Sequence, residues 1–168
     1  MKVVRNKTLT NKVFPFVLGV FCVVFDQISK IVADLWLPKT SGGVVIIPYL
    51  LDFRYVENTG AAFGWFSNQR WIFLIATTFF LAIAIYVFFK VKTLTVLVNY
   101  ALMLIIAGGF GNMIDRVLRG YVIDFINISC IDFFVFNIAD CCVVIGCGIF
   151  ILYLIMDTFK PKEKSTDK

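Results

Sequence analysis

The sequence predicts an all-α membrane protein with four transmembrane helices and a small β element outside the membrane. Of its 168 residues, 60% are hydrophobic and only 16% are charged, and the mean hydropathy is +0.89. A soluble globule of this size needs more polar surface, so the composition places the chain in a membrane. Four apolar segments are long enough to cross a hydrocarbon core of roughly 30 Å, which takes about 20 helical residues. The length suits a single integral membrane domain over residues 1–168.

The predicted spans are residues 13–37, 71–89, 94–114 and 138–156. The first follows a basic N-terminal tail, as the apolar core of a signal peptide does. It continues past Asp26 and is too long for that role, and no A-x-A cleavage site follows it. We therefore expect it to be a retained transmembrane helix.

The distribution of Lys and Arg predicts that both termini lie in the cytoplasm. Ten of the sixteen basic residues fall in residues 1–12, in the turn between the second and third spans, and in residues 160–168. Short cytoplasmic segments carry an excess of Lys and Arg, so both tails and the middle turn are assigned to the inside. Residues 38–70 and 117–137 then lie outside the cytoplasm, and an even number of spans agrees with this orientation.

The two outer segments have the character of short strands. Residues 44–47 are apolar and β-branched, and residues 51–57 alternate between apolar and polar side chains. A turn follows at 58–60, and the aromatic-rich residues 61–68 suit a short helix lying in the membrane interface. Two further β-rich stretches are residues 122–125 and 133–136.

Residue content excludes several classes of site. The chain has no His, which rules out a Ser-His or Cys-His nucleophile and HExxH zinc chemistry. Its five Cys residues include no CxxC pair, and four of them lie in apolar runs, where Cys acts as a small hydrophobic residue. We therefore expect no metal site and no disulfide framework. The basic residues adjoin the spans, so no nucleic-acid partner is expected.

Ionisable side chains inside membrane spans are costly, and each one is a candidate functional residue. Asp26 and Lys30 lie four residues apart on one face of the first span and can form an ion pair. The later spans and the second outer segment contribute the other candidates: Asn112, Asp115, Arg116, Asp124, Asn137 and Asp140. In the predicted orientation all of these residues lie in or next to the outer half of the membrane, so three spans place polar groups at one depth.

Carboxyl groups are the only candidates for a general acid and base in this cluster. Two Asp side chains that share a proton separate their pKa values, which leaves one base to activate water and one acid to protonate a leaving amine. We favour Asp124 with Asp140, because one lies just outside the membrane and the other lies one turn into the fourth span. The same cluster could equally form an ion or substrate path.

Structural roles are the simplest interpretation of several other residues. The Asp26–Lys30 pair is expected to be stabilising, Asp115 to pair with Arg116 or cap local backbone, and the GGFG run at 108–111 to allow close helix packing. Three acidic residues outside the spans are expected to be solvated loop charges: Asp52, Glu57 and Asp132.

Two other functional classes compete with a hydrolase. A small proton-coupled transporter could use Asp26, Asp115 and Asp140 as a relay. Its path should continue through the cytoplasmic halves of the spans, which are apolar apart from Asn99 and hydroxyl groups. A structural membrane scaffold would have no need of two unpaired Asp residues beside Asn and Arg.

Five sequence blocks occur in order along the chain: DQISK from Asp26, NTGAAF from Asn58, GGFGNMIDR from Gly108, VIDF from Val122 and FNIAD from Phe136. Together they resemble the lipoprotein signal peptidases, the signal peptidase II family, and the resemblance covers nearly the whole chain. After Asp140 this chain has Cys141-Cys142, where small residues such as Ser or Ala are usual in that family. This departure affects local packing only.

The resemblance implies an aspartic endopeptidase, a hydrolase of the bacterial cytoplasmic (inner) membrane with its active site near the outer leaflet. It implies Asp124 and Asp140 as the catalytic residues and a β-cradle formed by the outer strands. It implies substrate-binding or supporting roles for Asn58, Asn112, Arg116, Asn137, Asp26, Lys30 and Asp115.

The implied substrate is a prolipoprotein already modified with diacylglyceryl at its lipobox Cys, and the enzyme would cut just before that Cys. Membrane lipids would surround the enzyme, with no metal or cofactor required. We expect a monomer, and we expect the segment 58–70 to act as a mobile lid over the site.

Overall fold

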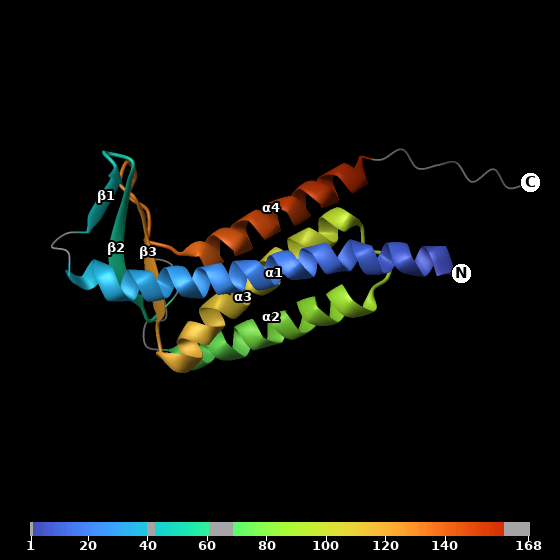
Figure 1. Cartoon of the computed structure of the whole chain (residues 1–168), viewed down its shortest axis with the longest axis horizontal. Helices are drawn as coiled ribbons and strands as arrows, with labels where there is room; N and C mark the ends of the chain where they lie inside the picture. The colour runs from blue at the N-terminus through green and yellow to red at the C-terminus, as the bar shows by residue number, and fades with distance from the viewer. Residues whose placement is uncertain (1, 40–42, 61–68, 160–168) are drawn as a thin grey trace, which may run out of the picture.

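A computed structural model of the chain describes residues 2–39, 43–60 and 69–159, and in these residues four long helices carry a three-stranded sheet at one end (Figure 1). The helices are α1 (Lys2–Trp36), α2 (Arg70–Lys90), α3 (Val96–Leu118) and α4 (Ile138–Thr158). Each contains a stretch long and apolar enough to cross a membrane, which in α1 runs from Asn11 to Trp36. The predicted fold class is confirmed.

The C-terminal end of α3 extends beyond the predicted span. Hydropathy alone ended this span at residue 114, but the helix continues to Leu118. Asp115 and Arg119 form an ion pair at a distance of 2.6 Å across one turn, and such i,i+4 pairs support a helix after its apolar residues have ended. At the other end, the Thr95 side chain accepts a hydrogen bond from the Val98 N–H and caps the helix.

Helix α3 lies at the centre of the bundle and packs against the other three helices. At Gly108 a Cβ atom would collide with the carbonyl oxygen of Ala139 on α4, and at Gly111 it would meet the carboxylate of Asp26 on α1. The predicted role of the GGFG run in close packing is thereby confirmed. The absence of side chains at these positions lets α1 and α4 approach α3 closely enough for polar groups on the three helices to meet.

Helix α2 is attached mainly through α3 and through one lysine on α1. Leu81 and Phe88 of α2 pack with Met103 and Ile106 of α3. The Lys12 ammonium group donates hydrogen bonds to carbonyl oxygens at the C-terminal end of α2: those of Phe88, Phe89 and Val91. These carbonyls have no partner within the helix, and a cation is the favoured group at this end of the helix dipole.

The sheet is antiparallel in the order β1-β2-β3, with β1 at Val44–Ile47, β2 at Leu51–Asn58 and β3 at Val122–Ile128. These strands confirm the expectation for residues 44–47, 51–57 and 122–125. Residues 133–136 were expected to form a strand as well, and this was wrong. Only Phe136 pairs, in an isolated bridge with Ile126, and the next residue, Asn137, is already the N-cap of α4.

Successive side chains of β3 point to opposite faces of the strand, and one of these faces packs on the helical bundle. Ile123 and Phe125 pack on Ala33 of α1 and on Leu37, which directly follows this helix. The residue between them, Asp124, therefore points to the opposite face of the strand. The β2–β3 register sets Asn58 opposite Val122, close in the sheet to Asp124.

The expectation that Asp52 is a solvated loop charge was wrong. Asp52 lies in β2 with only 6% of its surface exposed. Its carboxylate accepts hydrogen bonds from Arg54 at 2.8 and 3.0 Å, from Asn127 at 3.0 Å and from Ser129 at 2.5 Å. These bonds, first that of Arg54 and then that of Ser129, hold the pKa of Asp52 below its usual value.

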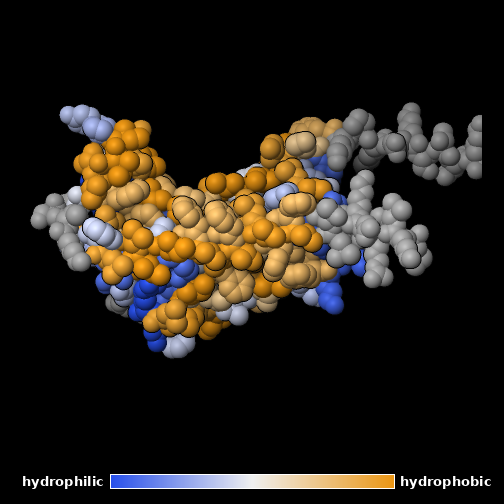
Figure 2. Space-filling model, in the orientation of Figure 1, coloured by the Kyte–Doolittle hydropathy of each residue, from blue (hydrophilic) through white to orange (hydrophobic). Residues whose placement is uncertain are grey.

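The start of α1 and the end of α4 lie at the end of the bundle opposite the sheet (Figure 1). This arrangement agrees with the predicted orientation, in which both termini face one side of the membrane. The surface of the helices is largely apolar, and the apolar surface continues onto the sheet (Figure 2). The interfacial helix expected at 61–68 lies outside the described residues, as does most of the segment 58–70 that we expected to form a lid.

Candidate active site

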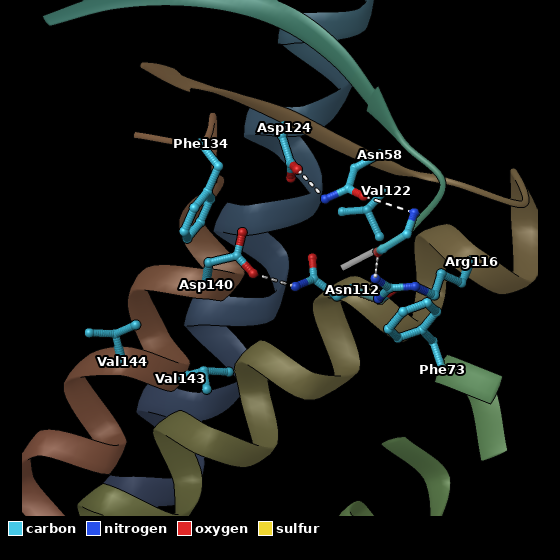
Figure 3. Close-up of a pocket in the computed structure, with 11 residues that line it drawn as sticks. Asn58, Phe73, Asn112, Arg116, Val122, Asp124, Phe134, Asp140, Val143 and Val144 are labelled. Atoms are coloured by element: carbon cyan, nitrogen blue, oxygen red, sulfur yellow. Dashed lines mark hydrogen bonds between the residues drawn. The ribbon is translucent and has the colours of Figure 1, made fainter. Parts of the chain in front are cut away.

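A cavity of about 280 Å³ lies where the sheet meets the bundle (Figure 3). It is lined by residues from β2, β3 and three helices: Asn58, Gly60, Phe73, Asn112, Arg116, Val122, Asp124, Phe134, Asp140, Val143 and Val144. Five of the predicted site residues are in this lining, namely Asn58, Asn112, Arg116, Asp124 and Asp140. The other four predicted residues, Asn137, Lys30, Asp26 and Asp115, lie behind the wall. Asn137 and Lys30 contact residues of the lining, and Asp26 and Asp115 are connected to it through Lys30.

Asp124 extends from β3 and is almost fully buried, with 2% of its surface exposed. One carboxylate oxygen accepts a hydrogen bond from the Asn58 amide at 2.8 Å, and the other accepts one from the Asn137 amide at 2.6 Å. Burial raises the pKa of Asp124 to about 6, and the charge of Asp140 acts in the same direction, while the Asn58 and Asn137 hydrogen bonds oppose the rise. The group is therefore poised to change its charge near neutral pH.

Asp140 lies in the first turn of α4 and takes part in its capping. The Asn137 side chain accepts a hydrogen bond from the Asp140 N–H at 3.0 Å, and the Asp140 carboxylate accepts one from the Asn137 N–H at 3.1 Å. This reciprocal capping box fixes the position of the carboxylate at the helix N-terminus. Its second oxygen accepts a hydrogen bond from the Asn112 amide at 2.7 Å, as the dashed line in Figure 3 shows.

The Asn137 amide connects the two carboxyl groups. Its nitrogen donates to Asp124 at 2.6 Å and to the side-chain oxygen of Asn112 at 3.1 Å, and Asn112 in turn donates to Asp140. Asn137 is fully buried. One side chain thus caps α4 and sets the orientation of both carboxylates, so a displacement of α4 would alter the site.

Lys30 occupies the centre of the cluster behind the wall. Its ammonium group is fully buried and lies 2.9 Å from Asp26, 3.0 Å from Asp115 and 3.0 Å from the side-chain oxygen of Asn112. Because Lys30 and Asn137 both donate to that oxygen, the Asn112 nitrogen must face Asp140. The expected ion pair of Asp26 with Lys30 is confirmed, and it is part of a larger network.

The expectation for Asp115 was wrong in one of its two alternatives. Asp115 pairs with Arg119 and Lys30, not with its neighbour Arg116. Adjacent residues on a helix point in different directions, so a partner four residues away is favoured over the next one. The alternative, that Asp115 caps local backbone, is confirmed by the hydrogen bond that it accepts from the Ile123 N–H at 3.4 Å.

Arg116 turns towards the cavity. Its guanidinium group donates to the carbonyl oxygen of Gly60 at 3.1 Å and stacks over the Phe73 ring, with 4.9 Å to the ring centroid. It therefore connects α3 with the end of β2 and with α2. In Figure 3 its side chain lies with Phe73 at one side of the cavity, and Asp140 with Val143 and Val144 lies at the other.

Two contributors to the network were missed by the sequence analysis. Arg119 pairs with Asp115, and Gln27 donates to Asp26 and to the carbonyl oxygen of Gly111, each at 3.1 Å. The i,i+4 spacing from Asp115 could have identified Arg119. Asp26 itself accepts a hydrogen bond from the Ala139 N–H at 2.8 Å, which ties α1 to the start of α4.

The arrangement suits acid–base chemistry at a buried site. Two carboxyl groups from separate elements line one cavity, and every carboxylate oxygen accepts a hydrogen bond from an uncharged N–H group. Uncharged donors hold such a pair in place without forcing both members to ionise. Among the described residues, no three of His, Cys, Asp and Glu gather into a metal-binding cluster.

Comparisons with known proteins agree on one family. A family model described as "Signal peptidase (SPase) II" matches residues 18–156. The lipoprotein signal peptidase of Staphylococcus aureus (strain MRSA252) is 39% identical over 149 residues, which is 88% of this chain and 91% of that protein. The counterpart in strain JH9 is 38% identical with the same coverage.

Two solved structures share the fold. Both are described as bacterial membrane enzyme structures obtained by the in meso method, and each is 36% identical to this chain. The first, at 2.3 Å resolution, has a TM-score of 0.83 and covers 92% of this chain and 94% of its own. The second, at 1.9 Å resolution, has a TM-score of 0.78 and covers 86% and 94%.

Proposed function

The chain belongs to the signal peptidase II family, and from that premise we propose that it removes signal peptides from lipoprotein precursors with Asp124 and Asp140 as its catalytic pair. It is a multi-pass membrane protein with four helices able to span a bilayer among its described residues. The observation that carries the proposal is that these two carboxyl groups line one cavity, each held by asparagine donors.

The charges of the network support a shared proton. The described residues at the cavity and behind its wall include four carboxylic acids, Asp26, Asp115, Asp124 and Asp140, and three basic groups, Lys30, Arg116 and Arg119. Uncompensated charge is costly in a buried site. One proton on the Asp124–Asp140 pair makes the whole set neutral, and that is the state in which one carboxyl is a base and the other an acid.

In the proposed reaction, the ionised carboxylate takes a proton from a water molecule as its oxygen attacks the carbonyl carbon of the scissile peptide bond. The protonated carboxyl stabilises the developing oxyanion, and the carbonyl becomes a tetrahedral centre. A proton then passes from the pair to the leaving nitrogen as the C–N bond breaks. The products are a carboxylic acid, which keeps the second hydrogen of the water molecule, and a free amine, and the pair returns to its starting state with one proton.

The walls of the cavity suit a lipid-bearing substrate. Phe73, Phe134, Val143 and Val144 contribute apolar surface beside the polar residues. We propose that the substrate is a precursor carrying diacylglyceryl on its lipobox Cys and that cleavage occurs just before that Cys. Such a substrate would reach the site by lateral diffusion in the outer leaflet of the bacterial inner membrane, with its acyl chains still in lipid.

The transporter alternative finds no support in the inner half of the bundle. A proton path must cross the membrane, and ionisable side chains usually mark it. Among the buried polar side chains of the described helices, only Asn99 lies in the half away from the sheet, and it is not ionisable.

The decisive experiment is cleavage of a lipidated precursor by the purified protein in detergent. Asp124→Asn and Asp140→Asn should each lower turnover by about 10³-fold or more, because catalytic residues that act as a unit fail together. Glu57→Gln, at an exposed position of β2, is the matched control and should keep turnover within about twofold. Each variant should unfold at nearly the wild-type temperature.

Two outcomes would contradict the proposed function. Near-normal turnover by a well-folded Asp124→Asn or Asp140→Asn variant would remove that residue from the mechanism. Loss of activity on treatment with EDTA, restored by a divalent ion, would show that the enzyme does not work by paired carboxyl groups alone.

A further inference from the structure

The hairpin formed by residues 44–54 has apolar side chains on both of its faces. Successive side chains of a strand point to opposite faces of the sheet, so a strand on a water-soluble surface usually shows at least one polar or covered face. In β1 all four side chains are exposed: Val44, Val45, Ile46 and Ile47. Neither face of this strand is therefore covered by the rest of the described protein.

The turn of the hairpin continues the same surface. Tyr49 is 92% exposed and has a φ of 61°, a left-handed conformation that is costly for a residue other than glycine. Leu50 beside it is 48% exposed. An exposed Tyr next to aliphatic side chains is typical of the aromatic belt at a membrane–water interface.

Polar groups in the hairpin are arranged so that no acid faces outward. Asp52, the single acidic residue in 44–54, is buried and held by Arg54, Asn127 and Ser129. The Arg54 side chain is 53% exposed, but its guanidinium group is paired with Asp52. The hairpin thus presents aliphatic groups, one Tyr and an ion pair without net charge, which is a surface suited to the boundary between headgroups and acyl chains.

We propose that residues 44–54 form a membrane anchor that lies in the boundary between headgroups and acyl chains of the leaflet on the sheet side of the protein. On the face that Figure 2 shows, the apolar surface of the helices reaches the apolar surface of the sheet, beside a hydrophilic patch at the lower left. The hairpin therefore extends an existing lipid-facing surface. In water the same strand would be an exposed apolar edge, which is a site of aggregation.

The depth of the anchor follows from its backbone. Strand β1 lies at the edge of the sheet, with β2 on one side only. Unpaired N–H and C=O groups cannot be left in the hydrocarbon core, where they have no hydrogen-bond partner. Water and lipid headgroups supply such partners at the boundary, so the backbone lies there and only the side chains reach the acyl chains.

The anchor would position the site in the membrane. Strand β2 joins the hairpin directly to Asn58, and β2 pairs with β3, which carries Asp124. Fixing the hairpin at one depth therefore fixes one half of the proposed catalytic pair at that depth. This consequence rests on the proposed function, whereas the anchor itself does not and can be tested without any measurement of cleavage.

The test uses spin labels in the full-length protein in lipid nanodiscs containing phosphatidylglycerol. The five native cysteines are replaced, and single cysteines are introduced by Ile46→Cys, Tyr49→Cys and, as a control at the other end of β2, Glu57→Cys. Oxygen collects in the acyl region and a nickel chelate stays in water. For each label, the accessibility to oxygen is divided by the accessibility to the nickel chelate. This ratio should be at least about threefold higher at position 46 than at position 57, because interfacial anchors bury apolar groups about 5–10 Å deep. Position 49 should fall between them.

A second measurement keeps the native sequence, in case the cysteine replacements impair folding. Lipids with a photoreactive group near the glycerol end of an acyl chain should form adducts within residues 44–50 and not within 55–58. Equal nickel accessibility at 46 and 57, together with no adducts in 44–50, would overturn the anchor. Spin–spin broadening at 46 with low access to both reagents would also overturn it, because a second copy of the chain would then cover the strand.

Discussion

At the scale of single residues, asparagine is the side chain that organises the site. Asn58, Asn112 and Asn137 donate to the two carboxyl groups, and Asn137 also caps the helix that carries Asp140. An amide donor stabilises a carboxylate without adding charge. The pair can therefore pass a proton between its members while the fixed cation, Lys30, stays behind Asn112.

The pKa of Asp124 predicts a pH dependence of cleavage. Burial raises this pKa to about 6, so Asp124 is mainly ionised above pH 6 and protonated below it. A pair with a proton on each member has no base, so kcat/KM should fall as the pH is lowered through about 6. The Asn58 hydrogen bond lowers the pKa of Asp124, so its removal in Asn58→Ala should move this acidic limb to higher pH, by about one unit.

The measurement is the pH profile of kcat/KM for the wild type and for Asn58→Ala, with Glu57→Ala as the neighbouring control. Loss of activity in Asn58→Ala without a shifted limb would mean that Asn58 serves a different role, such as substrate binding. A shift to lower pH would contradict the assigned hydrogen bond.

Several of these residue positions could be predicted from the sequence, and others could not. The Asp26–Lys30 spacing and the Asn137–Asp140 spacing are local, because both are set by one turn of a helix. The burial of Asp52 depends on Asn127 and Ser129, which are more than seventy residues away. No local pattern distinguishes such a residue from a solvated charge in an alternating strand.

At the scale of helices and strands, the contact between α3 and α4 holds the site together. Gly108 lies against the backbone of Ala139 and Val143, next to Asp140. Helix boundaries could be read from hydropathy, with errors where polar residues extend a helix, as at Leu118. The pairing of helices could not be read in this way, because in lipid it depends on the shapes of the facing surfaces and not on hydrophobicity.

Two glycine substitutions test this contact. Gly108→Ala should destabilise the protein by about 1–3 kcal/mol, because the added methyl group collides with the α4 backbone. Gly148→Ala in the same helical bundle should be neutral or stabilising by about 0.5–1 kcal/mol, because nothing lies within 4 Å of the added group and Ala favours the helix. Thermal unfolding in detergent measures both, and cleavage should fall with Gly108→Ala alone. Equal effects of the two substitutions would show that α3 and α4 are not in close contact.

At the scale of the whole molecule, polar groups are distributed unevenly along the long axis of the helical bundle. The buried ionisable groups gather at the sheet end, and both described ends of the chain lie at the other end (Figure 1). The positive-inside rule then predicts that the termini face the cytoplasm and that the sheet and cavity face outward. This orientation is needed for a site that receives substrates from the outer leaflet.

Cysteine labelling checks the orientation. Cys130 is exposed at the end of the sheet, whereas Cys142 is buried in α4. A membrane-impermeant maleimide added to protoplasts should label Cys130 and should fail to label Cys142. A Cys130→Ser variant is the control and should lose the signal. Labelling of Cys130 only in inverted vesicles would reverse the orientation.

The ion pairs within single helices also bear on how the protein enters the membrane during synthesis. Helix α1 carries Asp26 together with its own counterion Lys30, and α3 carries Asp115 together with Arg119. Segments leave the ribosome in order, so α1 must partition into lipid before α3 exists. Because each helix contains a cation next to its own carboxylate, neither helix exposes an unpaired acid to lipid before the other helices are inserted. The Lys30–Asp115 contact then forms between helices that have already been inserted. The same charges that hold the finished site together thus allow its helices to be delivered one at a time.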